Sequence, residues 1–84
     1  MAEEKKIGEV IHYYTELKVA AIKLSDVLKT GDTIRIKGHT SDLTQKVESM
    51  QIDRQEVESA KKGDSVGMRV EDHVRENDEV FLIS

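Results

Sequence analysis

Cysteine, proline and tryptophan are all absent from this chain of 84 residues. Without cysteine the protein can form neither a disulfide framework nor a thiolate metal site, so its small core must hold without covalent support. A chain without cysteine also suits a reducing compartment, and we therefore expect a cytoplasmic protein.

Long apolar runs are missing as well. No apolar run exceeds four residues, whereas a membrane-spanning helix needs about 20. The first six residues are mostly charged, and no apolar stretch of signal-peptide length follows them. We therefore expect no membrane or targeting segment, a flexible charged N-terminus over residues 1–6, and a single domain over residues 7–84.

The motifs that would indicate catalysis are not found either. No Gly-x-x-x-x-Gly-Lys-Ser/Thr loop is present to hold the phosphates of a nucleoside triphosphate. The histidines His12, His39 and His73 lack the close sequence spacing of zinc sites. No Gly-x-Ser-x-Gly motif positions a serine nucleophile. We expect a non-catalytic protein with no cofactor, no metal and no nucleoside triphosphate.

Charge is abundant, with 17 acidic and 13 basic residues and a net charge of −4. This balance gives no overall attraction to the phosphates of a nucleic acid. The basic residues nevertheless concentrate between Lys29 and Lys46, and the acidic ones between Glu71 and Glu79. Two interpretations follow: two oppositely charged solvated faces, or a binding face built on the basic stretch.

Alternation of apolar and polar residues predicts short strands. Ile7–Tyr14 and Leu17–Leu24 are rich in β-formers and are separated by Thr15 and Glu16, which predicts a hairpin. Three further strands are predicted at Thr33–Lys37, Val66–Val70 and Val80–Ile83.

The stretch from Leu43 to Ile52 fits a strand only if it contains a bulge near Ser49, which would bring Val47, Met50 and Ile52 to one face. The following ten residues, 53–62, predict a loop with at most a short strand or turn.

Turn residues divide these strands. Gly31-Asp32 and Gly63-Asp64 each precede a predicted strand, and Asn77-Asp78 does the same before Val80. About six short strands with little helix are typical of an all-β fold. We expect a small, closed, six-stranded antiparallel β-barrel of Greek-key type, because closure removes exposed strand edges.

Three ordered segments carry a family resemblance. Leu28–Gly38, Val47–Gln51 and Ala60–Val70 together resemble the barrel domain, domain 2, that follows the GTPase domain in elongation factor Tu and initiation factor 2. The resemblance covers almost the whole chain and implies a translation-factor barrel that stands alone without a GTPase domain.

The resemblance also implies a site for RNA, either tRNA or ribosomal RNA. In elongation factor Tu the corresponding strand helps form the pocket for the terminal adenosine of aminoacyl-tRNA, through a glutamate and an arginine. Gln51 stands at the glutamate's position, and Arg54 stands at the arginine's, where a solvated loop arginine is the alternative. Combined with the basic stretch, the candidate RNA-binding residues are Lys37, His39, Lys46, Gln51 and Arg54.

A second hypothesis places the chain in another class. Similar barrels occur as terminal domains of larger enzymes, including collagenase-like peptidases, where they accompany catalysis without performing it. The chain would then be a protein-interaction or accessory barrel with a protein partner. The negative net charge favours this hypothesis, whereas the resemblance to translation factors favours RNA.

Overall fold

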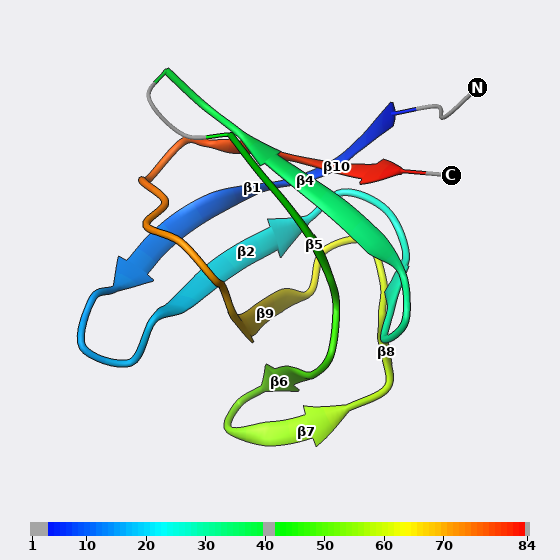
Figure 1. Ribbon diagram of the computed structural model, residues 1–84. Helices are drawn as coiled ribbons and strands as arrows, with labels where there is room; N and C mark the ends of the chain where they lie inside the picture. Colours follow the sequence, from blue (N-terminus) through cyan, green and yellow to red (C-terminus); the bar gives the residue numbers. More distant parts are fainter. Residues whose placement is uncertain (1–3, 40–41, 84) are drawn as a thin grey trace.

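The computed structural model describes residues 4–39 and 42–83, and within these ranges the backbone forms strands and turns (Figure 1). None of the described residues belongs to a helix long and apolar enough to cross a membrane. Because every regular element of the described residues is a strand, the all-β class is confirmed. The strands are β1 (Glu4–Tyr14), β2 (Val19–Leu24), β3 (Leu28–Lys29), β4 (Thr33–Lys37), β5 (Asp42–Lys46), β6 (Met50–Ile52), β7 (Gln55–Val57), β8 (Ser59–Ala60), β9 (Ser65–Arg69) and β10 (Glu79–Ile83).

Eight of these strands form one curled antiparallel sheet in the order β5-β4-β10-β1-β2-β9-β6-β7, and β3 pairs with β8 separately. The expectation of a closed six-stranded barrel is wrong, because β5 and β7 remain at the two edges of the sheet. Val47–Ser49 connects the edge strand β5 to β6, which lies beside the other edge strand β7, and the described residues form no ladder between β5 and β6. The side chain of β5 residue Gln45 instead reaches the backbone at the end of β9.

The core is built by the alternation that the sequence predicts. In β4, Ile34 and Ile36 are fully buried, and the intervening Arg35 is partly exposed. Val66 and Met68 of β9 are buried in the same manner. Each buried aliphatic side chain contributes about 1.5–3 kcal/mol relative to an exposed one. The other buried apolar residues are Ile7, Val10, Ala20, Ile22, Leu24, Leu28, Val47, Met50, Ala60, Val70, Val74 and Val80.

Turns of one design precede β4, β9 and β10. In the first turn, the Asp32 carboxylate accepts the N–H of Lys29 at 3.0 Å, and the Asp32 N–H donates to the Lys29 carbonyl at 3.2 Å. The third residue, Gly31, has a φ of 94°, a conformation that favours glycine. The turns Lys61–Asp64 and Arg75–Asp78 repeat both hydrogen bonds.

Each turn continues into a β-bulge that faces a buried aliphatic residue. Gly31 donates to the Val47 carbonyl, and the Val47 N–H donates to the Asp32 carbonyl, both at 2.8 Å. Gly31 and Asp32 thus lie opposite the single residue Val47. This is the pattern of a β-bulge whose first residue has a left-handed conformation. The other two turns form the same pair of bonds, with Leu24 and with Val10. Such bulges increase local twist, so they explain why the sheet curls.

Some predicted boundaries differ from the structure. β1 begins at Glu4, so residues 4–6, which were expected in a flexible N-terminus, lie in a strand that pairs with β10. The β1–β2 loop spans Thr15–Lys18 instead of two residues. The bulge expected near Ser49 is instead a break in the strand, after which Met50 is buried as predicted.

Candidate functional site at the free edge of β5

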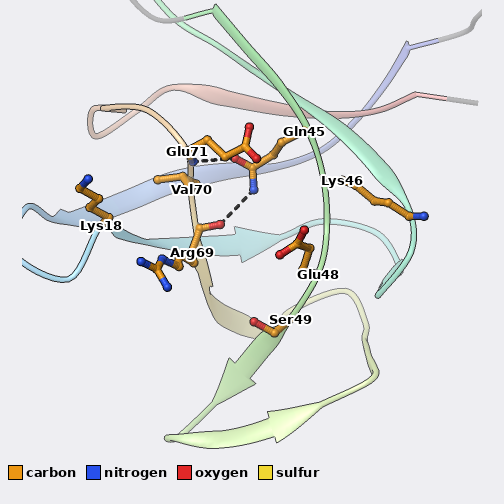
Figure 2. A pocket seen from close by; sticks show the side chains of 8 residues that line it. All are labelled: Lys18, Gln45, Lys46, Glu48, Ser49, Arg69, Val70 and Glu71. Atoms are coloured by element: carbon orange, nitrogen blue, oxygen red, sulfur yellow. Dashed lines mark hydrogen bonds between the residues drawn. The ribbon is translucent and has the colours of Figure 1, made fainter.

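A polar cleft of about 440 Å³ lies between β5 and the end of β9 (Figure 2). One wall is formed by β5 and the residues that follow it, and the other by the end of β9 and the residues beyond. Charged side chains of both signs surround the opening, so the cleft suits a polar occupant. The lining residues are Lys18, Gln45, Lys46, Glu48, Ser49, Arg69, Val70 and Glu71.

Gln45 joins the two walls of the cleft. Its Nε2 donates to the Arg69 carbonyl at 2.9 Å, and its Oε1 accepts the N–H of Glu71 at 2.9 Å. The side chain of Gln45 is nearly buried, with 8% of the residue exposed. No ladder forms between β5 and β9 among residues 4–39 and 42–83, so this amide supplies the hydrogen bonds that a neighbouring strand would otherwise supply. Because each bond fixes a backbone group, Gln45 holds the cleft at a defined width.

The backbone of β5 presents unpaired groups beside the cleft. Val47 donates to Asp32 at 2.8 Å, so its N–H points toward β4. Residues of an antiparallel strand alternate in this respect, and Gln45 therefore also bonds to β4. By the same alternation, the N–H and C=O groups of Thr44 and Lys46 point away from β4. Within the described residues no hydrogen bond reaches these four groups.

The charged side chains of the cleft are available for an external partner. Lys18, Lys46 and Arg69 are exposed, and none forms an ion pair within residues 4–39 and 42–83. The same holds for Glu48 and Glu71. No cluster of three or more His, Asp and Glu side chains that could hold a metal ion occurs in the described part of the chain. The chemistry that the cleft offers is hydrogen bonding and charge recognition.

The other end of β5 is held by an arginine. Arg35 donates from Nε and Nη2 to the two carboxylate oxygens of Asp42, both at 2.8 Å, and from Nη1 to Glu4 at 2.6 Å. This guanidinium lowers the pKa of the Asp42 carboxyl, mainly through the hydrogen bonds, and the two acids raise the pKa of Arg35. Arg35 thus links β5 and β1 across the outer face.

Two of the candidate RNA-binding residues lie among acidic groups. Lys37, at the end of β4, is paired across the sheet with Glu79 of β10. Lys37 and His39 line a hollow of about 420 Å³ together with Glu76 and Glu79. The basic and acidic stretches of the sequence therefore meet here.

The remaining three candidates lie elsewhere. Lys46 is at the opposite end of the β4–β5 hairpin, about 13 Å from Lys37 along the strand, and is the candidate that lines the cleft. Gln51 and Arg54 are exposed in the β6–β7 hairpin. Asp53 and Arg54 form its two-residue turn, with φ of 51° and 67°. The structure therefore places the five residues in three separate regions, and RNA binding by them stays a prediction.

Sequence reasoning did not find the residues that define the cleft, Gln45, Arg69 and Glu71. One signal was present for Gln45. It occupies the same face of β5 as Leu43, where alternation calls for an apolar residue. A polar residue at an inward position requires a hydrogen-bond partner, because burial without one is costly. Its partners lie 24 and 26 residues away in the sequence, so local patterns could not identify them.

Comparisons with known proteins identify relatives among proteases. An uncharacterized protease of Methanocaldococcus jannaschii is 46% identical over 79 residues, which are 93% of this chain. A collagenase of Porphyromonas gingivalis is 36% identical over 77 residues, or 89% of this chain. The chain spans only 19% and 21% of these two relatives. No family model matches the sequence.

Solved structures agree with these relatives in fold. Two crystal structures of the C-terminal domain of a Geobacillus thermoleovorans protein assigned to the U32 peptidases superpose with TM-scores of 0.86 and 0.87. They cover 90% and 93% of this chain, and the match covers 96% and 91% of their own chains. Identity is 19% and 18%, so this likeness concerns the fold alone.

These comparisons correct the family expectation. The resemblance to the barrel domain of elongation factor Tu and initiation factor 2 is wrong, because the relatives found by sequence are proteases and the structural neighbours are peptidase C-terminal domains. The motifs behind that resemblance are the Gly-Asp turns and the strands that follow them. These elements shape the curled sheet. The relatives instead support the second hypothesis, an accessory domain similar to the terminal domains of collagenase-like peptidases.

Proposed function

We propose that this chain is a non-catalytic accessory domain of a collagenase-like peptidase. The domain has a binding role, whereas another part of the peptidase hydrolyses the substrate. The supporting observation is the 46% identity to a protease of which the matched region is only 19%. Four fifths of that relative, outside the match, are available to carry the catalytic groups.

The residues of the cleft agree with a binding role. Gln45 is engaged through both polar atoms of its side chain, and Ser49 is exposed in a loop. No histidine lines the cleft to serve Ser49 as a general base. The proposal therefore assigns the cleft to the recognition of a binding partner. A cytoplasmic location of the chain remains a prediction.

Hydrolysis and association provide the test. The purified chain is incubated with fluorescein-labelled gelatin and casein, and no release of label above that of a mock purification is expected. The tagged chain is then recovered from its native cells with and without ribonuclease, and mass spectrometry identifies what is bound. A collagenase-like peptidase should be recovered in both samples. Hydrolysis by the chain alone, or recovery of ribosomal proteins that ribonuclease abolishes, would contradict the proposal.

A further inference from the structure

The free edge of β5 combines an unpaired backbone with unpaired charge. Thr44 and Lys46 direct their N–H and C=O groups away from β4, with the spacing at which a strand pairs with a neighbour. Lys46 also has no ion-pair partner within the described residues. We propose that this edge binds an extended peptide, which adds a strand beside β5 and places an acidic side chain opposite Lys46.

Backbone pairing is the first step of the argument. An extended peptide can exchange two N–H···O=C bonds with one residue of an edge strand and repeat the pair two residues later. Thr44 and Lys46 are two residues apart and have the same orientation, so they offer two such positions. RNA has no alternating backbone donors and acceptors with which to form this ladder, and the edge therefore favours a peptide.

Charge is the second step. Lys46 and Arg69 both line the cleft beside this edge, and Lys18 adds a third exposed cation. Opposite charges on directly facing residues of two strands stabilise the pairing. The acidic side chain of the peptide is therefore expected opposite Lys46.

Rigidity is the third step. Gln45 is bonded to Arg69 and Glu71, and Arg35 is bonded to Asp42 at the other end of the strand. The edge is consequently held in its strand conformation before a peptide arrives. A preorganised edge loses less conformational entropy on binding.

The other edge of the sheet offers a matched comparison. Within the described part of the chain β7 pairs only with β6. Ile52 and Gln55 flank the two-residue turn of that hairpin as a hydrogen-bonded pair. Glu56, one residue further, therefore directs its N–H outward in the same way as Thr44. Glu56 does not line the cleft beside β5. The edge of β7 is therefore a free strand edge without this cleft.

The probes are two acetylated and amidated peptides, SVTETVS and SVTKTVS, with an oligouridine as a third probe. Binding is followed by the amide signals of the ¹⁵N-labelled chain. SVTETVS should shift the amide signals of Thr44 and Lys46 and slow their hydrogen exchange. SVTETVS should bind about threefold more tightly than SVTKTVS, because one cross-strand charge pair separates the two peptides.

Two proline variants locate the binding edge. Thr44→Pro removes an outward N–H at a place where edge strands accept proline, and it should weaken binding of SVTETVS by about tenfold. Glu56→Pro makes the same change at the edge of β7 and should bind SVTETVS like the unaltered chain. The dispersion of the amide spectrum shows whether each variant is folded.

A charge reversal provides a test that does not depend on proline. Lys46→Glu leaves the backbone intact and should reverse the preference, so that SVTKTVS binds more tightly than SVTETVS. The proposal is overturned if the peptide shifts centre on Glu56, or if Lys46→Glu leaves the preference unchanged. It is also overturned if millimolar SVTETVS shifts no amide of β5, including the case in which only oligouridine does so.

Discussion

The side-chain amide of Gln45 donates to the backbone carbonyl of Arg69 at 2.9 Å, across a gap that no pair of strands bridges. The same side chain accepts the N–H of Glu71. This side chain therefore links β5 to the end of β9, between which the described residues form no strand ladder. This arrangement leaves β5 with a free edge and creates the cleft beside it.

Replacing Gln45 by methionine tests this role. Methionine has a similar length but neither donates nor accepts strongly, so both hydrogen bonds are lost and two backbone groups lose their partner. We expect the free energy of unfolding to fall by about 1–3 kcal/mol, measured by urea denaturation.

Gln45→Glu is the control for this substitution. A carboxylate still accepts the Glu71 N–H but cannot donate to the Arg69 carbonyl and brings a charge to a nearly buried position, so at neutral pH Gln45→Glu should be at least as destabilising as Gln45→Met. Equal stability of Gln45→Met and the unaltered chain would show that β5 and the end of β9 are held together by other contacts.

The left-handed turns predict a second effect. Gly31 has a φ of 94°, and no atom outside Gly31 and its two chain neighbours lies within 4 Å of the position that a Cβ would occupy. Gly31→Ala should therefore lower stability by about 1–2 kcal/mol through backbone conformation alone. Gly31→Asn should lose less, because asparagine tolerates this region and already occupies it at Asn77. Thermal unfolding of the two variants measures the difference, and an alanine variant at least as stable as the asparagine variant would contradict it.

The residues that could be predicted from sequence are those whose structure is decided locally. Ile34 and Ile36 alternate with polar neighbours and are buried as predicted. The Gly-Asp pairs mark turns because glycine allows the positive φ and aspartate accepts the N–H of the first turn residue. The way in which β5 meets the end of β9 could not be predicted, because it depends on bonds between Gln45 and backbone groups more than 20 residues away.

Acid should weaken the link between β4 and β5. Arg35 lowers the pKa of Asp42, and Lys5 lowers the pKa of Asp26, in both cases mainly through a hydrogen bond to the carboxylate. A carboxyl with a folded-state pKa below its unfolded value of about 3.9 stabilises the fold above that pH, and this contribution is lost as the pH falls through the folded pKa. Stability should therefore decrease below about pH 4.

Asp42→Asn measures the share of this loss that comes from the Arg35 pair. The variant should be less stable than the unaltered chain at pH 6, and the difference should shrink as the pH falls below 4. Urea denaturation at several pH values gives both curves. Glu16→Gln serves as the matched control, because Glu16 is exposed and forms no ion pair within the described residues. Parallel curves for Asp42→Asn and the unaltered chain would contradict the prediction.

RNA binding by the basic residues can be tested through its salt dependence. Lys37 and Lys46 lie at opposite ends of one hairpin, so an RNA strand that meets both must neutralise two separate phosphates. Each neutralised phosphate of a single strand contributes about −0.7 to the slope of log K against log salt concentration. Changing both lysines to glutamate should therefore weaken binding and reduce that slope by about 1.4 in magnitude. Filter binding of a tRNA mixture over a range of salt concentrations measures both quantities, and an unchanged slope would exclude these lysines from any RNA contact.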